Sequence, residues 1–303
     1  MNDSQGESFH MKSTEKNRQL CSTAARIAAI VVACLANSPA RAQTKSAADD
    51  KAQAKEWADQ ASRLALAEAW GYDIRAGKKD GEPLKLTETP VLKWSNNYDA
   101  TVFGSVFVWT RSGRPEVIAS IFKFYTTRIS FTAELHSLST QPLVAQKSSA
   151  IVWQPPEAGV VFKDVPEVPA PAKTATARLA QMRDIARNFS AEVTTVISKT
   201  KHELRLMPQP LLRYGGTSPE LLDGALFVFA RATDPDVLLL LEAKAPAGQV
   251  PHWEFALARM HVGALAVKYR DKEVWAVEEL AQPYGRKDGV YTLLQDLPEP
   301  KVE

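Results

Sequence analysis

Cysteine is nearly absent from this chain of 303 residues, in which it occurs only at Cys21 and Cys34. Both positions fall within residues 1–42, which have the features of a removable leader. The remaining 261 residues therefore offer no disulfide, no thiol nucleophile and no cysteine metal site. A cysteine-free exported chain depends on a hydrophobic core, and this one is long enough to build it.

Long apolar runs are also missing. The apolar stretch from Ile27 to Ala36 has ten residues, about half of what crosses a bilayer, so the sequence predicts no transmembrane segment in the mature chain. Basic residues precede the stretch and Ala40-Arg41-Ala42 follows it, a pattern typical of a signal peptide cleaved before Gln43. Translation from Met11 would give a leader of more usual length. We therefore expect a periplasmic or secreted protein.

A second interpretation of the leader stays open. Val31-Val32-Ala33-Cys34 resembles the box at which bacterial lipoproteins are cut and acylated, which would make the protein a lipoprotein acylated at Cys34. The Ala-Arg-Ala site downstream matches its own pattern better, so soluble export is the main expectation.

Net charge is absent from the mature chain. Removing residues 1–42 takes away five basic and three acidic residues, which leaves 32 of each sign. A neutral protein has no overall field that gathers phosphates, so we expect no nucleic-acid partner. The partner is expected to be an unidentified envelope ligand or protein, and the oligomeric state is left open.

Motifs that carry known chemistry are missing as well. The sequence has no G-x-S-x-G elbow, P-loop, G-x-G-x-x-G loop, EF-hand or helical zinc motif. We therefore predict no catalytic residue, no metal ligand and no cofactor.

An internal repeat is present. Residues 104–121 align without a gap with residues 224–241, and six of the eighteen positions are identical. Flanking landmarks keep the same order: Arg-Leu-Ala at Arg63 and Arg178, and Val-Trp at Trp153 and Trp275. Chance gives about one identity over such a length, so the pattern indicates a duplicated unit.

Each unit is expected to begin with a helix. Apolar residues recur at helical spacing in residues 47–70. A second stripe, the most regular in the chain, comprises Leu179, Met182, Ala186, Phe189, Val193 and Val196. It predicts one helix with a buried seam through Phe189.

Strands are expected after each helix. Apolar, β-branched and aromatic runs separated by turn residues predict strands at 101–110, 117–125, 129–138 and 143–153, then at 204–214, 224–232, 236–244, 253–262, 265–270 and 273–277. Short connections between them favour antiparallel meanders.

The predicted fold is α+β, with two tandem repeats that each pack a helix on a curved antiparallel meander sheet. The boundaries are a signal peptide at 1–42, a first repeat at 43–154, a Pro-rich linker at 155–176, a second repeat at 177–281 and a partly ordered tail at 282–303.

Four residues are candidates for binding. Arg111 and Arg231 are the charged residues matched within the repeat, and each ends an apolar strand, so they are either paired anion contacts or charges that protect strand ends. His136 and His261 lie in the strand after each hairpin. They could form a paired site between the repeats or be unrelated strand residues.

Several stretches resemble an uncharacterised family of exported bacterial proteins: Leu92 to Asn96, Gly104 to Val117, Glu134 to Ser139, Arg178 to Arg183 and Asp223 to Phe227. The resemblance implies export and carries no established activity, so it assigns no catalytic residue.

The sequence thus favours an exported, non-catalytic binding or interaction protein of the bacterial envelope. One alternative is an envelope-space hydrolase that uses His136 or His261 as its base. Another is a structural protein that associates through its sheet edges. An enzyme should place a histidine and a carboxylate in one cleft, whereas a binding module should show an apolar or aromatic groove without such a pair.

Overall fold

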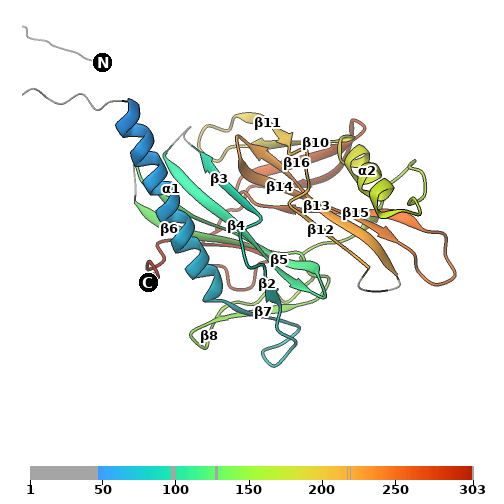
Figure 1. The fold of residues 1–303 in the computed structure, drawn as a ribbon, viewed down its shortest axis with the longest axis horizontal. Helices are drawn as coiled ribbons and strands as arrows, with labels where there is room; N and C mark the ends of the chain where they lie inside the picture. The colour runs from blue at the N-terminus through green and yellow to red at the C-terminus, as the bar shows by residue number, and fades with distance from the viewer. Residues whose placement is uncertain (1–46, 97–99, 127–128, 217, 219, 302–303) are drawn as a thin grey trace, which may run out of the picture. The chain divides into compact units, whose positions relative to one another are not determined.

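The computed structural model describes residues 47–96, 100–126, 129–216, 218 and 220–301. The expected signal peptide, Met11 and both cysteines lie outside these residues. The described part is an α+β fold with two helices, and all pairings between its named strands are antiparallel (Figure 1). The predicted α+β class with antiparallel sheets is therefore confirmed.

The first half begins with helix α1, Ala47–Trp70, as its periodicity predicts. The strands that follow are β1 (Asp73–Ala76), β2 (Lys85–Leu86), β3 (Leu92–Asn96), β4 (Val102–Arg111), β5 (Arg114–Phe124), β6 (Ser130–Ser137), β7 (Leu143–Lys147), β8 (Ala150–Trp153) and β9 (Lys163–Asp164).

The second half begins with helix α2, Ala175–Ala186. Its strands are β10 (Phe189–Thr194), β11 (Lys201–Leu206), β12 (Leu212–Tyr214), β13 (Leu221–Arg231), β14 (Asp234–Lys244), β15 (His252–Arg259), β16 (Ala264–Tyr269), β17 (Lys272–Val277) and β18 (Tyr291–Leu294).

The single long helix expected through Phe189 is wrong. Helix α2 ends at Ala186, and Phe189–Thr194 forms β10, which pairs with β11 and β16. The apolar residues Phe189, Ala191 and Val193 alternate with more exposed neighbours, so they fit a strand as well as they fit a helix. Pairing with two neighbouring strands favours the extended form.

Strand order is the same in both halves. In the second half it runs β17-β16-β10-β11-β13-β14-β15-β9, with β12 added on β13. The first half has β8-β7-β1 as a separate sheet and then β2-β4-β5-β6-β18, with β3 added on β4. The last strand of each order comes from the other half, because β9 pairs with β15 and β18 pairs with β6.

The register of the strand pairs also matches between the hairpins of the two halves. In the β4–β5 hairpin Trp109 lies opposite Val117 and a bulge follows, and in the β13–β14 hairpin Phe229 lies opposite Val237 and a bulge follows. The β7–β8 and β16–β17 hairpins share a second bulge, next to Trp153 and Trp275.

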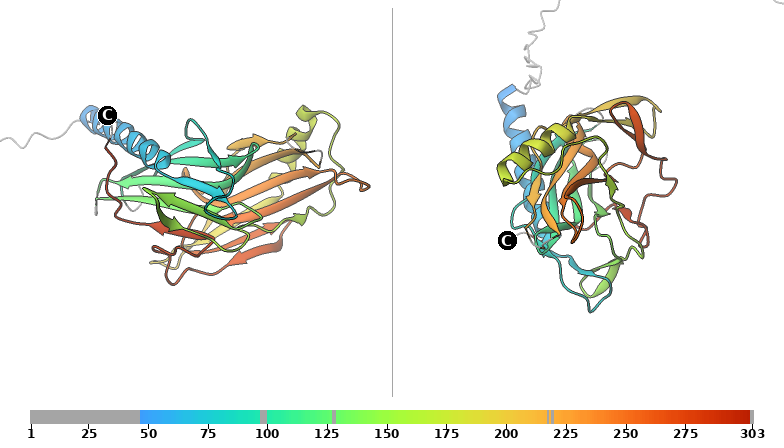
Figure 2. Two further views of the ribbon diagram at one scale, coloured as in Figure 1. Left: turned by 90° about the horizontal axis from the view of Figure 1, so that it is seen from below. Right: turned by 90° about the vertical axis from the view of Figure 1, so that its right-hand side faces the viewer.

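Three apolar cores hold these layers together. One lies between α1 and the first sheet, and one lies within the second half under α2. The third joins the opposite face of β4–β5 to the β13–β14 hairpin, so that α1 and the second-half strands lie on opposite sides of the first sheet (Figure 2). Lys163 of β9 donates to the carbonyl of Val274 in β17 at 3.3 Å, so the second sheet curls until its two ends meet.

The two hairpins cross so that each tip rests on the open end of the other. Thr233, in the turn before β14, exchanges hydrogen bonds of 3.1 and 3.0 Å with the backbone of Ser95 in β3. At the other end Arg114 donates to Glu242 at 2.9 Å. In the described part of the chain, neither helix combines the length and the apolar composition needed to cross a bilayer.

Candidate functional site

A cavity of about 240 Å³ opens where the tip of the β13–β14 hairpin meets the first sheet. Its wall combines aromatic and aliphatic side chains with a few ionisable ones: Trp94, Asn96, Ala100, Val102, Phe122, Phe124, Glu134, Asp234, Met260, His261, Val262, Tyr291 and Leu293. We call it the tip cavity.

The apolar wall of the tip cavity is built around Trp94 in β3. Its indole lies over Gly104 of β4, where a Cβ atom would come within 2.2 Å of the ring. The indole Nε1 donates to the hydroxyl of Ser120 at 2.9 Å, and the ring packs at a tilt against Phe122. Trp94 is thus fixed in place, and the wall it forms is rigid.

The polar wall comes from β6 and β18. Glu134 and His136 are two residues apart in β6 and so share one face of the strand. Tyr291 lies opposite His136 in register and donates its hydroxyl proton to Glu134. Burial raises the pKa of Glu134 well above its ordinary value, and the hydrogen bond from Tyr291 opposes the shift.

Two aspartates of the hairpin tip behave in the same way. Burial raises the pKa of Asp234 to about 7, although a hydrogen bond from Asn96 and the charge of Arg231 oppose the shift. Burial and then the neighbouring Asp234 raise the pKa of Asp236, whose carboxylate accepts the backbone N–H of Arg231 at 3.0 Å.

Both histidines are held neutral. Burial is the main cause that lowers the pKa of His136 and of His261 to about 4, and the positive charge of Arg259 adds to it in each case. His261 Nδ1 accepts the backbone N–H of Gly263 at 2.9 Å, which leaves the ring proton on Nε2. His136 Nδ1 donates to the carbonyl of Ser137 at 2.7 Å.

Arg259 donates hydrogen bonds to backbone carbonyls and does not line the tip cavity. Its guanidinium donates to the carbonyls of His261, Val262, Gly263 and Glu278 at 2.6–3.1 Å. These bonds fix the loop that carries His261.

The four residues predicted to bind do not form one site. His261 lines the tip cavity, His136 lies next to Tyr291, and Arg231 lies close enough to Asp234 and His261 to shift the pKa of both. Arg111, at the matching hairpin position, lies at the opposite end. The structure therefore places Arg231 and His261 at the tip of β13–β14, and His136 beside Tyr291 of the cavity wall.

Arg111 lines a second cavity, of about 500 Å³, with Arg114, Glu116 and Lys244. We call it the charged cavity. Its charges are paired: Arg111 and Arg114 donate to Glu116 at 3.2 Å, and Arg114 and Lys244 contact the buried Glu242 at 2.9 and 2.6 Å. Each of these three cations thus contacts a buried carboxylate of the protein itself.

One further group of ionisable residues could hold a metal ion. Among the described residues, Asp164, His252 and Glu254 are close enough together to hold a cation, and they lie on β9 and β15 outside both cavities.

Sequence reasoning missed Glu134, Asp234 and Tyr291. Glu134-x-His136 carries a usable signal, because residues two apart in a strand share a face. Asp234 and Tyr291 reach the cavity through contacts between distant segments, which no local pattern shows.

Comparisons of the chain with models of protein families, with curated proteins and with solved structures find no match. No residue role is carried over from a relative, so the geometry alone carries the functional argument.

Proposed function

We propose that this protein is an exported, non-catalytic binding protein of the bacterial envelope and that the tip cavity holds its ligand. The observation that carries the proposal is a partly open cavity that combines packed aromatic side chains with ionisable groups whose pKa values burial shifts toward their uncharged forms. Binding pockets commonly combine an apolar lining with a few fixed polar groups.

The cavity selects a small, uncharged ligand. An apolar cavity of about 150 Å³ binds benzene, so 240 Å³ suits a substituted single ring or a fused pair of rings. The His261 Nε2–H is a donor, and the raised pKa values of Glu134 and Asp234 favour the protonated, donating form of each carboxyl, so the ligand should offer an acceptor such as a hydroxyl or carbonyl oxygen.

A hydrolase is the second candidate, because His261, Glu134 and Asp234 border one cavity. The lowered pKa and the Gly263 hydrogen bond leave His261 a poor base at neutral pH. Among the described lining residues there is no serine, threonine or cysteine that could act as a nucleophile. These features favour binding over hydrolysis.

Association through sheet edges is less well supported. Among the strands at the ends of the described sheets, β2 and β9 have two residues each, β1, β8 and β18 have four each, and β17 has six. Short edge strands are a known way of preventing edge pairing.

A thermal-shift titration with indole, 2-naphthol and 4-bromophenol tests the proposal. We expect at least one of the three to raise the melting temperature progressively, because it binds only the folded state. Ala100→Trp fills the cavity from its rim and should weaken that response at least about tenfold, whereas Ala150→Trp, on the exposed start of β8, should not. No shift at 1 mM for all three compounds, or equal responses of the two variants, would contradict the proposal.

Export is a separate part of the proposal, supported by the leader pattern. Expression of the full chain in a Gram-negative host should yield periplasmic protein beginning at Gln43, as read by N-terminal sequencing. Acylated Cys34 in the mass spectrum would instead favour a lipoprotein, and an uncleaved cytoplasmic form would contradict export.

We also infer that the two halves are tandem repeats of one unit. The shared strand order, the matching hairpin register and the bulges after Trp109 and Phe229 support this inference, although the first half divides its strands between two sheets and β13–β14 has a further bulge near Leu221. On that basis the tip cavity and the charged cavity occupy equivalent places, with Asp234 where the other has Arg114. The tip cavity has an open apolar wall, whereas ion pairs cross the charged cavity.

A further inference from the structure

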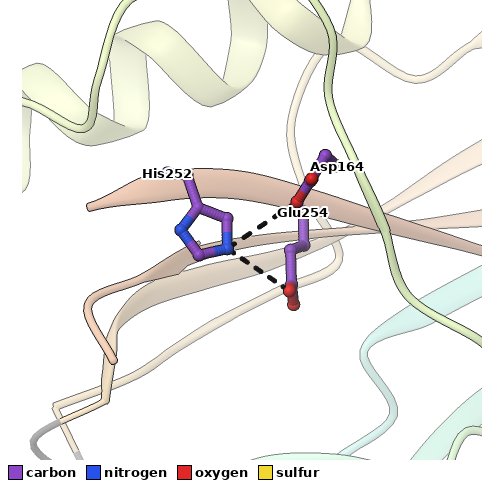
Figure 3. Close-up of side chains that lie close together, drawn as sticks. All are labelled: Asp164, His252 and Glu254. Atoms are coloured by element: carbon purple, nitrogen blue, oxygen red, sulfur yellow. Dashed lines mark hydrogen bonds and ion pairs between the residues drawn. The ribbon is translucent and has the colours of Figure 1, made fainter. Parts of the chain in front are cut away.

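We propose that Asp164, His252 and Glu254 form a binding site for a divalent transition-metal cation such as Zn²⁺, which fastens β9 to β15 (Figure 3). This site is independent of the proposed ligand cavity. It joins the linker between the two halves to the sheet of the second half.

The spacing of the donor atoms fits one small cation. His252 Nε2 lies 3.4 Å from Glu254 Oε1 and 3.7 Å from Asp164 Oδ1, and all three donor atoms lie within 4.8 Å of one another. Ligands at about 2.0–2.1 Å from a tetrahedral zinc ion are about 3.4 Å apart. Little movement is therefore needed to close the site around a metal.

A hydrogen bond from outside the group orients the imidazole. His252 Nδ1 lies 3.2 Å from the carbonyl oxygen of Val250, which can only accept, so Nδ1 carries the proton. The Nε2 lone pair then faces the two carboxylates, as Figure 3 shows. Metal-bound histidines usually make this same second hydrogen bond to a carbonyl or carboxylate.

Other cations do not neutralise the two carboxylates. Within the described residues, no lysine or arginine pairs with Asp164 or Glu254. The nearby Lys163 donates to Val274, and Lys244, opposite His252 in register, contacts Glu242. Three acceptors thus converge on a point that lacks a positive charge.

The strand register explains why the group forms. Asp164 lies directly opposite Glu254 in the β9–β15 pair, and His252 shares the face of Glu254 because it is two residues away. Strand β9 has only two residues, so two pairings and the hydrogen bond from Val165 to Trp253 hold it to the sheet. A metal would add three bonds at that point.

The donor set selects the class of metal. One imidazole nitrogen and two carboxylate oxygens suit zinc and neighbouring transition metals better than calcium or magnesium, which prefer oxygen alone. Asp164 is 81% exposed and His252 31% exposed, so water can complete the coordination.

Calorimetric titration of the tag-free, EDTA-treated full chain with Zn²⁺ tests the site. We expect one equivalent to bind, His252→Ala to weaken binding at least about tenfold, and Glu254→Gln and Asp164→Asn to weaken it less. His202→Ala, on β11 away from the group, is the matched control and should bind as the original chain does.

Thermal unfolding and proteolysis with Zn²⁺ are two further tests of the metal site. Zn²⁺ should raise the melting temperature of the original chain but not that of His252→Ala, and should slow proteolysis of residues 155–176 in the original chain but not in Asp164→Asn. Equal affinity in His252→Ala, or no binding below 1 mM, would overturn the proposal. An ion pair of protonated His252 with the carboxylates would then account for the group.

Discussion

Burial at the tip cavity has the same result for acids and for bases, because it disfavours whichever form is charged. It raises the pKa of Glu134 and Asp234 and lowers that of His136 and His261. Burial therefore shifts each group toward its uncharged form, and Asp234 is about half ionised at pH 7. The surroundings of the ligand are set by hydrogen-bond donors more than by charge.

Asp234 provides a pH test of this account. The pKa of Asp234 is about 7 in the folded chain, against an ordinary value of 3.8. The folded state therefore keeps the proton at higher pH than the unfolded state does, and the free energy of unfolding falls as pH rises from 3.8 to 7. Asp234→Asn does not titrate and should gain roughly 1–2 kcal/mol relative to the original chain between pH 5 and pH 8. Because Asp234 is partly exposed to water, this gain in stability is smaller than the full pKa shift would give.

Urea unfolding at the two pH values measures the difference. Asp184→Asn, on the exposed face of α2, is the control and should show the same small effect at both. If the Asp234→Asn difference is also independent of pH, Asp234 titrates as an ordinary carboxylate and the site is charged.

The matched glycines show what residue patterns predict and what they leave out. Gly104 and Gly224 are identical positions of the repeat. Only the structure gives their reason: each lies under an aromatic ring, Trp94 or Tyr214, that leaves no room for a Cβ atom. The ring that a glycine accommodates comes from another strand, so the sequence reveals the glycine but not its partner.

At the scale of elements, Phe189 belongs to β10 and packs against Phe255 and Tyr269 with ring centroids 5.2 and 4.7 Å apart. Phe189→Ala should cost about 3–5 kcal/mol, because it empties a buried site. Arg187→Ala, at the exposed end of α2, should change stability by no more than about 0.5 kcal/mol. Denaturant unfolding compares the two, and similar losses would show that Phe189 is not in the core.

Strand β18 tests the exchange of strands between the halves. A chain ending at Val290 loses β18, which leaves β6 as an edge and exposes Glu134 and His136. We expect a large loss of stability, on the order of 3 kcal/mol or more, since Tyr291 and Leu293 are buried. A chain ending at Pro300 keeps β18 and should unfold as the full chain does. Equal midpoints for the two truncations would show that β18 contributes little.

Local patterns predicted the elements that depend on local sequence. The helix expected at 47–70 is confirmed, and the run at 101–110 corresponds to β4, because each has one clear period. The pattern after Ala186 is ambiguous, because Phe189 and Val193 fit a helical spacing of four and also belong to an alternating set with Ala191. The pairings of β9 and β18 join segments about 90 and about 155 residues apart, which periodicity does not encode.

At the scale of the whole molecule, the candidate site arises from the crossing of two hairpins. The sequence pointed to His261 and Arg231, which lie near this crossing, and to Arg111, which lies at the other end. The sequence could not show that Arg111 and Arg231, which match in the repeat, lie at opposite ends of the structure. The two hairpins cross in opposite directions, so their tips lie apart. Two chemically different cavities are the consequence.

The tip cavity is proposed to bind a small, uncharged ring. Crystals soaked with 4-bromophenol locate the ligand directly through the anomalous scattering of bromine. The account predicts a bromine peak beside Trp94 and His261 in the original chain and none there in Ala100→Trp. Bromine found only in the charged cavity or on the surface, or equally beside Trp94 in both crystals, would contradict it.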